Sequence, residues 1–292
     1  MDLKKWVALG SAVMLLMGVF ALGGCSTAGS DEPTGEGADG LEGTINVQGS
    51  DTMLNIGTAW SEAFMDENPG VEVSVQGGGS GTGIAALING TVDLANASRD
   101  IKDEEITEAE GKGVFPVEHK VAIDGIAVIV NPANGVEALT MEQLGGIYRG
   151  EITNWKDVGG ADSEIVLLSR DSSSGTYEFF KEEVVGEDSE YAAAAKLLPS
   201  TQAIVDEVMA NEAGIGYIGL GYLTDDVKVI AIDGVKASIE TAADGSYAIS
   251  QYLYMYSNGE VEGIMKAYLD WILGPVGQQL VADARHADLG AS

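Results

Sequence analysis

The strongest constraint on the fold is an alternation, from residue 43 onward, of short β-branched runs with longer segments of helical period. Residues 44–47 (TINV) are followed by Ile56, Trp60 and Phe64, which are spaced along one face of a helix. Runs of this kind in regular succession are typical of βα units with parallel strands. The sequence therefore predicts an α/β fold.

The same pattern continues to the end of the chain. Residues 125–130 are apolar throughout and are closed by Asn131-Pro132, which indicates a strand buried on both faces. No repeat of fixed period is visible. Further strands are expected at 71–75, 92–94, 165–168, 214–218, 227–232 and 252–256, and further helices from 141, from 176, at 191–198, from a cap at Thr201, and at 261–272 and 276–284.

The first 25 residues form a segment of their own. Lys4 and Lys5 precede an apolar run at 6–22, and two glycines and Cys25 follow, which predicts a secretory signal peptide. The alternative is a transmembrane anchor, because the run is borderline in length for spanning a bilayer. The end of the segment (LGGC) resembles the lipobox of bacterial lipoproteins, which implies a lipidated Cys25 at the mature N-terminus. Cys25 is the only cysteine, so no internal disulfide can form.

Residues 26–42 (STAGSDEPTGEGADGLE) are rich in Gly, Ser, Pro and acid, and lack a hydrophobic pattern. They are expected to form a flexible acidic linker. The chain has a net charge of -31, and because residues 1–25 carry +1, the remainder carries -32 by difference. Nucleic acid is excluded as a partner for so negative a protein. An acidic surface also suits a salty medium, which is a hypothesis about habitat.

Three predicted strand-to-helix turns share one chemistry: GSDT at 49–52, GGSGTG at 78–83 and SSGT at 173–176. The first turn of a helix has unpaired amides and the positive end of the helix dipole, so it favours an anion. Glycine lets the backbone approach closely, and each hydroxyl adds a donor. In open α/β sheets ligands gather at the carboxyl ends of strands, where these turns lie. The alternative is that their Ser and Thr residues are ordinary helix caps.

Several chemistries are excluded by the motifs that are missing. The sequence has no GxxxxGK[ST] phosphate loop, no GxSxG nucleophile elbow and no HExxH zinc motif. The only histidines, His119 and His286, are interpreted as surface or structural residues. We therefore expect no cofactor, no metal and no catalytic residues.

Four segments carry a resemblance to a known family: GGGSGTGIAALINGTVDLANASR, GEITNWKDVGG, SRDSSSGTYEFF and GIGYIGLGYL, in this order. In them the chain from residue 43 resembles the PstS-like phosphate-binding proteins of ABC phosphate importers. The resemblance implies a two-lobed periplasmic-binding-protein-like fold of type II, with the ligand cleft between the lobes. Lobe one is then 43–123 plus 237–292, and lobe two is 124–236. It also implies a non-enzymatic monomer outside the membrane, lipid-anchored, that hands phosphate to permease subunits.

The family's phosphate ligands can be transferred to this sequence by the same resemblance. Arg170 then supplies a positively charged guanidinium with N–H donors in a fixed geometry, and the three turns supply hydroxyl and amide donors for the same oxyanion. The remaining implied ligands are Ser50, Asp51 and Thr52 in the first turn, Ser80 in the second, and Ser174, Gly175 and Thr176 in the third.

The chain departs from the family at two positions. The family commonly places a proton-accepting Asp where this chain has Ser98, and an Asp two residues past the arginine where it has Ser172. Our hypothesis is that Asp51 accepts the proton of hydrogen phosphate instead, because sulfate has no such proton and would be repelled by the carboxylate. The alternative is that Asp51 is a plain N-cap.

Arg99, directly after Ser98, is a further candidate ligand. Its alternative role is a salt bridge to Asp51, Asp93 or Asp100. Other functions also remain: the same fold binding sulfate, molybdate or tungstate, a secreted hydrolase or phosphatase using a serine of SSGT, or a sensor or adhesive surface protein without a transporter.

Overall fold

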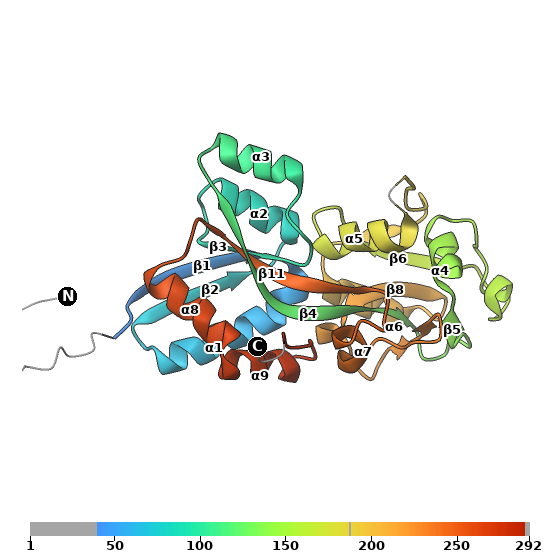
Figure 1. Cartoon of the computed structure of the whole chain (residues 1–292). Helices are drawn as coiled ribbons and strands as arrows, with labels where there is room; N and C mark the ends of the chain where they lie inside the picture. The colour runs from blue at the N-terminus through green and yellow to red at the C-terminus, as the bar shows by residue number, and fades with distance from the viewer. Residues whose placement is uncertain (1–39, 187, 290–292) are drawn as a thin grey trace, which may run out of the picture. The chain divides into compact units, whose positions relative to one another are not determined.

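Strands and helices alternate along residues 40–186 and 188–289, which are the residues that the computed structural model describes (Figure 1). The predicted α/β fold is therefore confirmed. Residues 1–25 with the Cys25 prediction, and all but the last three residues of the predicted linker 26–42, lie outside this part of the chain. From Gly40 onward the chain forms one compact unit.

The bounds of the elements follow the predicted pattern closely. The buried residues of α1 include Ile56, Trp60 and Phe64, as the helical spacing predicts. The first elements are β1 (Gly43–Gly49), the short η1 (Asp51–Met53), α1 (Leu54–Glu67), β2 (Val71–Gln76), α2 (Ser80–Ile88), β3 (Leu94–Ala97) and α3 (Asp103–Gly111). The last elements are β11 (Ser250–Asn258), α8 (Gly263–Leu273) and α9 (Pro275–Asp283).

The middle of the chain begins with one long strand, β4 (Pro116–Val130), whose residues from Ile126 to Val130 are fully buried. This confirms the prediction from the apolar run. The elements that follow are β5 (Ala138–Leu139), α4 (Met141–Tyr148), η2 (Trp155–Val158), β6 (Val166–Arg170), α5 (Gly175–Phe180), η3 (Lys181–Val185), β7 (Lys196–Leu198), α6 (Thr201–Ala210), β8 (Gly214–Gly219), η4 (Leu220–Tyr222), β9 (Lys228–Val229), β10 (Ala231–Ile232) and α7 (Ile239–Ala243).

Within the described residues the main sheet has the strand order β2-β1-β3-β11-β4-β8-β6-β7, with β9 beside β4. β1 pairs parallel with β2 and β3, and β6 pairs parallel with β7 and β8. β11 is antiparallel to both of its neighbours, and β4 is antiparallel to β8. Each parallel group needs helices as crossovers, which explains the βα succession in the sequence.

Two long strands join the two parallel groups. Residues 116–125 of β4 pair with β11, whereas residues 126–130 pair with β8. The change of partner marks a junction at residues 125–126 of β4. Figure 1 shows β4 and β11 running side by side up to this junction.

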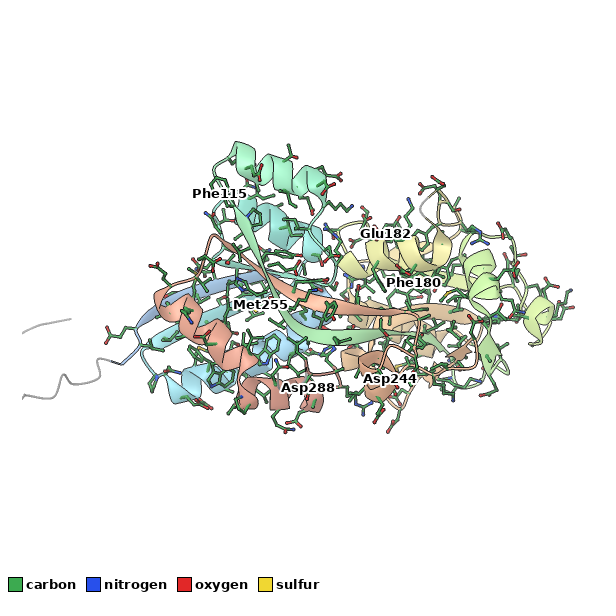
Figure 2. The ribbon with its side chains drawn as sticks, in the orientation of Figure 1. Phe115, Phe180, Glu182, Asp244, Met255 and Asp288 are labelled. Carbon is green, nitrogen blue, oxygen red and sulfur yellow. The ribbon has the colours of Figure 1, made fainter. Side chains whose placement is uncertain are left out.

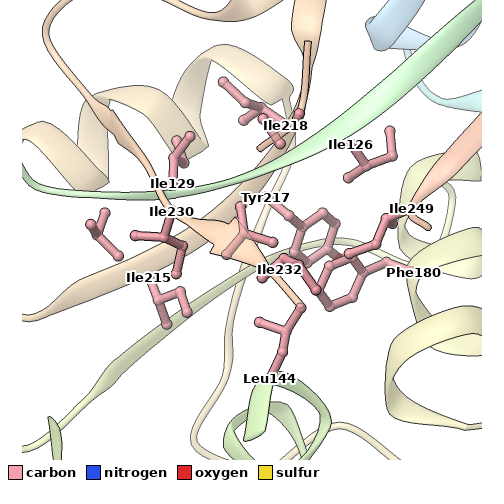
Figure 3. Packing of buried hydrophobic residues seen from close by; sticks show 14 of the residues in the cluster. Ile126, Ile129, Leu144, Phe180, Ile215, Tyr217, Ile218, Ile230, Ile232 and Ile249 are labelled. Atoms are coloured by element: carbon pink, nitrogen blue, oxygen red, sulfur yellow. The ribbon is translucent and has the colours of Figure 1, made fainter. Parts of the chain in front are cut away.

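The hydrophobic core is divided in the same way. One cluster contains buried residues from 126 to 249, and its aromatic centre is Phe180 stacked on Tyr217 with ring centroids 3.9 Å apart (Figure 3). Two other clusters draw on residues 45–122 and 253–281. The separation of the cores agrees with two lobes joined by β4 and β11.

The segment 237–249 was expected in lobe one, and its packing points elsewhere. Ala237, Ala242, Tyr247 and Ile249 all belong to the cluster around Phe180. The Tyr247 hydroxyl also donates to the carbonyl of Ile126 at 2.9 Å. By its contacts this segment belongs with residues 126–232.

The expectation of a helix at 191–198 is wrong. Residues 196–198 form β7, which pairs in parallel with β6, and the residues before them form a turn whose Ala192 amide donates to the carbonyl of Tyr148. The alanine-rich pattern favours a helix locally, but pairing with the edge of β6 overrides this weak local preference. The expected cap at Thr201 is also corrected: the Ser200 hydroxyl accepts from the amide of Ala203.

Candidate functional site

Five buried hydroxyl groups meet at the ends of the strands. Ser98 Oγ lies 3.0 Å from Ser50 Oγ, 3.3 Å from Ser80 Oγ and 3.4 Å from Thr176 Oγ1. Thr52 Oγ1 lies 2.8 Å from Thr176 Oγ1. Each of the five residues is at most 3% exposed. We call Ser50, Thr52, Ser80, Ser98 and Thr176 the hydroxyl cluster.

Sheet register explains why residues so far apart in sequence converge. Gln48 is paired with Gln76, and Gly49 with Asn96, so β1, β2 and β3 end at one edge. The residues that directly follow these strands therefore share that edge. Thr176 reaches the cluster from the other parallel group, on α5. The hydroxyl cluster thus joins both groups of strands.

The alternative that these residues are ordinary helix caps holds for Ser174. Its hydroxyl accepts from the amide of Tyr177 at 3.3 Å. Ser50 makes no side-chain cap bond, and Ser80 Oγ instead accepts from the Ser98 amide at 3.0 Å. The hydroxyls of Ser50 and Ser80 are therefore directed to the cluster rather than to a helix start.

Gly175 lies against the cluster so closely that a side chain has no space. A Cβ at this position would lie 2.3 Å from Ser80 Oγ and 2.8 Å from Ser98 Oγ. Gly175 and Thr176 are also the first residues of α5, whose amides have no partner within the helix. The glycine of the SSGT turn is thus explained by close approach of backbone to hydroxyls.

Arg170 brings a buried positive charge to the same region. It is 1% exposed, and its Nη2 lies 2.6 Å from Asp51 Oδ2. Nη1 donates to Thr201 Oγ1 at 2.8 Å, and Nη2 also donates to the carbonyl of Pro199 at 3.2 Å. The buried Nε makes no hydrogen bond within the described chain. These contacts use three of the five N–H groups, so the guanidinium is fixed in orientation with two donors to spare.

Asp51, rather than a residue next to Arg170 in the sequence, is the carboxylate that pairs with Arg170. Ser172 stands two residues past the arginine, and neighbouring Asp171 accepts from the amide of Ser173 rather than from Arg170. Besides Arg170, Asp51 accepts from the amide of Gly78 at 3.2 Å through Oδ1. Each carboxylate oxygen has two lone pairs, so both keep capacity for another donor.

Two residues of the site were not predicted from the sequence. Thr201 holds the Arg170 guanidinium, although the sequence suggests only a cap. The hydroxyl of Tyr222 donates to the carbonyl of Asp51 at 2.8 Å. Burial, assisted by the Asp51 charge, raises the pKa of Tyr222 to about 12, so the hydroxyl keeps its proton. Both contacts join residues more than 30 positions apart, where sequence gives no signal.

Arg99 has a partner different from those expected. Its Nη1 and Nη2 lie 2.8 Å and 2.7 Å from the two carboxylate oxygens of Glu105. The expected salt bridges to Asp51, Asp93 or Asp100 are therefore wrong, and only the carbonyl of Asp100 is bonded. Burial is the largest single influence and opposes the charged forms, but the hydrogen bonds and the attraction between opposite charges together outweigh it, raising the pKa of Arg99 and lowering that of Glu105.

Further contacts connect the two groups of strands around the hydroxyl cluster. The Gly81 amide donates to the carbonyl of Ser173 at 3.0 Å. At the rim, Lys102 Nζ lies 3.1 Å from a carboxylate oxygen of Glu178. The site is therefore enclosed by contacts from both sides.

Among residues 40–186 and 188–289 there is no cluster of three or more His, Cys, Asp or Glu side chains suited to a metal ion. No helix in this part of the chain has both the length and the apolar character needed to cross a membrane. His119 contacts Ser257, and His286 contacts Asp124.

Comparison with known proteins gives a consistent picture. A family model described as a PBP superfamily domain matches residues 34–276. The phosphate-binding protein PstS of Bacillus subtilis (strain 168) is 36% identical over 269 residues, covering 89% of this chain and 87% of that protein. The PstS protein of Pseudomonas aeruginosa PAO1 is 31% identical over 314 residues, covering 100% and 96%.

A solved structure is similar over nearly the whole described chain. It is the crystal structure, with bound phosphate, of a substrate-binding protein assigned to a phosphate ABC transporter of Clostridium perfringens. The two chains are 33% identical with a TM-score of 0.80, and the match covers 85% of this chain and 100% of that one.

Proposed function

This chain belongs to the PBP superfamily, in its group of PstS phosphate-binding proteins, and from this premise we propose that it captures inorganic phosphate for import. It acts outside the cytoplasmic membrane and delivers the anion to an ABC permease. It binds its substrate without making or breaking a bond. The observation that carries this function is the convergence of a buried guanidinium with five buried hydroxyls from both groups of strands.

The geometry suits a small tetrahedral oxyanion. Hydroxyls can turn their protons toward an anion, and first-turn amides and a guanidinium add fixed donors. Closure over the anion removes water, and these groups replace its hydration shell. The ligand set we propose is Ser50, Asp51, Thr52, Ser80, Ser98, Arg170, Ser174, Gly175 and Thr176, with Arg99 beside it.

A negatively charged protein can bind an anion here because short-range contacts within the site contribute more to binding than the distant charges of the surface. Charges at the protein surface are screened by salt over about 8 Å at physiological ionic strength. Donors in the buried site act at hydrogen-bond distance in a medium of low dielectric. Nearby dipoles and Arg170 therefore outweigh the distant acidic surface.

Asp51 gives the site its selectivity in this proposal. Hydrogen phosphate has a proton to donate, and the free capacity of the Asp51 carboxylate accepts it. Sulfate has none, so it faces a negative group without a hydrogen bond between them. Because Arg170 also pairs with Asp51, the same carboxylate sets both the charge of the site and its preference for a protonated anion.

The lobes proposed for closure are residues 43–123 with 237–292, and residues 124–236. Their separate cores and the crossing strands β4 and β11 support this division. The packing of 237–249 with the second core favours placing the boundary nearer to residue 250. The binding unit acts as a monomer.

The anchor is the remaining part of the proposal. Residues 1–25 act as a signal peptide that ends at a lipidated Cys25, and residues 26–42 tether the binding unit to the membrane. Cys25→Ser tests this in cells. The variant protein should leave the membrane fraction and lose the mass of the lipid, whereas retention in the membrane would point to a spanning segment.

Native mass spectrometry of gently purified protein tests the function itself. We expect a bound mass that matches phosphate and is lost on dialysis at low pH. Titration calorimetry of the stripped protein should then show one site for phosphate and much weaker binding of sulfate. Retention of molybdate, tungstate or sulfate in preference to phosphate would overturn the assignment.

A further inference from the structure

A buried ion-pair geometry outside the hydroxyl cluster has no role in the function proposed so far. His286 Nδ1 lies 2.9 Å from Asp124 Oδ1, and both side chains are 0% exposed. Because a carboxylate can only accept, Nδ1 is the ring nitrogen that carries the hydrogen. We call Asp124 and His286 the hinge clasp.

The position of the hinge clasp in the fold is specific. Asp124 lies in β4, two residues before the point where that strand changes its partner from β11 to β8. Its Oδ1 also accepts from the amide of Leu220, in the turn that follows β8. His286 comes from the C-terminal segment beyond α9. One carboxylate oxygen therefore bonds to groups on both sides of the junction.

The turn opposite the hinge clasp is shaped to fit it. A Cβ on Gly219 would lie 2.4 Å from Asp124 Oδ2, and a Cβ on Gly221 would lie 2.5 Å from His286 Nε2. The two glycines of the GLG segment thus allow the close approach of this turn to both side chains. A buried pair without a special role in the fold would not need one glycine against Asp124 and another against His286.

The same turn leads directly to the proposed phosphate site. Tyr222, at its end, donates its hydroxyl to the carbonyl of Asp51. A Cβ on Gly219 would also lie 2.7 Å from Thr52 Cγ2, so the turn packs directly against the first donor-rich turn at residues 49–52. A short series of contacts therefore runs from His286 through Asp124 and the turn to Asp51 and Thr52.

The hinge clasp is costly if it serves stability alone. Asp124 Oδ2 and His286 Nε2 are buried and make no hydrogen bond within the described residues. An unpaired buried polar atom costs about 1–3 kcal/mol. Such costs persist where a group serves function.

We propose that Asp124 and His286 are positioning residues that hold the lobes in the closed arrangement, and that the hinge clasp forms as phosphate is enclosed. This rests on the function proposed above. Closure brings the Leu220 turn and the C-terminal segment to the same carboxylate, and the turn then presses Tyr222 and Gly219 against the phosphate segment. Phosphate affinity is reduced by the fraction of molecules whose clasp is unformed.

The chain offers a direct test, because it has only two histidines. In protein labelled with ¹⁵N-histidine, NMR spectra resolve the two rings during titration with inorganic phosphate. The ring of His286 should move to new resonances in step with phosphate binding. His119 also lies in β4, but it contacts Ser257, away from the junction at residues 125–126. The resonances of its ring should therefore stay unchanged.

Variants separate positioning from simple packing. His286→Leu should weaken phosphate binding by about tenfold or more, mainly through faster dissociation, since a hydrogen bond to a charged group is lost. His286→Asn keeps a side-chain donor near Nδ1 and should recover most of the affinity. The matched control His119→Asn should bind phosphate as the unaltered protein does.

The outcomes are distinguishable. If calorimetry shows no phosphate binding by the unaltered protein, the proposed function fails. If phosphate binds while the His286 resonances stay fixed, the hinge clasp proposal fails alone. It also fails if His286→Leu lowers the thermal unfolding midpoint but leaves phosphate affinity unchanged. The titration of the unaltered protein decides the question even if His286→Leu does not fold.

Discussion

At the scale of single residues, Asp51 joins the buried guanidinium, the glycine-rich turn and the turn after β8. Its carboxylate bonds to Arg170 and to the Gly78 amide, and its carbonyl accepts from Tyr222. These partners come from both sides of the junction. A substitution at this position therefore changes charge, selectivity and closure together.

Asp51→Asn tests the selectivity hypothesis. The amide removes the negative charge that repels sulfate and leaves the Arg170 charge unpaired, so sulfate affinity should rise while phosphate affinity falls. The sulfate dissociation constant divided by the phosphate dissociation constant, both measured by calorimetry, should fall by about tenfold or more. This is the expected effect of losing one buried charged contact. Asp93→Asn, outside the site, is the control. Unchanged discrimination against sulfate in Asp51→Asn would discard the hypothesis.

Gly175→Ala tests the close packing of the third turn. The added methyl group overlaps Ser80 Oγ and Ser98 Oγ, so it should push α5 away from the hydroxyl cluster. Overpacking costs about 1–3 kcal/mol, so phosphate should bind about tenfold or more weakly.

The matched control for this substitution is Gly111→Ala. Gly111 is the last residue of α3, and a Cβ there meets nothing within 4 Å. We expect unchanged phosphate binding in calorimetry for this variant. Equal affinities for the Gly175 and Gly111 variants would show that the third turn does not contact the anion.

Residues that belong to local patterns could be predicted from the sequence. Ser50, Ser80 and Thr176 follow strands in Gly-rich turns, and a parallel sheet must bring such turns to one edge. The pairing of Arg170 with Asp51 spans 119 positions and could not be predicted. Arg99 illustrates the same limit, because the first turn of α3 places Glu105 nearer than the three aspartates considered.

At the scale of elements, an ion pair connects the start of α3 with α5 at the rim of the site. Lys102 precedes α3, and Glu178 lies in the first turn of α5. Their ion pair is partly exposed, with side-chain exposures of 33% and 21%. An exposed pair of this kind contributes about 0–1 kcal/mol, so it adjusts closure without determining it.

Lys102→Gln measures that contribution. Loss of the pair should speed phosphate release by up to about fivefold at low ionic strength, and the effect should fade as salt screens the charges. Stopped-flow dissociation rates would show both trends. Lys112→Gln breaks a pair between Glu108 of α3 and the residue that directly follows this helix, and it should leave release unchanged. A salt-independent effect of Lys102→Gln would exclude the electrostatic explanation.

The elements themselves were predictable where the pattern was long and periodic, as in α1 and β4. The short strand β7 was not, because its alanine-rich approach favours a helix until the edge of β6 is available. The predicted strand at 227–232 is divided between β9, which pairs with β4, and β10, which pairs with β5. Pairing partners distant in sequence decide such cases.

At the scale of the whole molecule, the dominant property is the excess of acid. The chain has 46 Asp and Glu against 15 Lys and Arg. Glu182, Asp244 and Asp288 are exposed examples on three different segments (Figure 2). Many like charges on one surface repel each other and oppose the compact state.

The folded protein should therefore gain stability with salt. We expect the thermal unfolding midpoint to rise as KCl increases from low to molar concentration, because screening weakens the repulsion among the carboxylates. Sucrose at equal osmolality serves as the control for effects other than screening. A midpoint that does not depend on KCl would remove the hypothesis of adaptation to a salty medium.

β4 is paired on both sides of the point where it changes partner, with β11 over residues 116–125 and with β8 over residues 126–130, and the β11 pairing has one irregularity between Leu253 and Tyr254. A hydrogen-bonded ribbon bends by small rotations at many residues rather than by a large rotation at one. Its intrinsic twist consequently sets a preferred angle, and every departure meets an elastic restoring force. If the lobes close over the anion as proposed, this ribbon is the element that must bend, and its preferred twist favours the open arrangement once the anion has left.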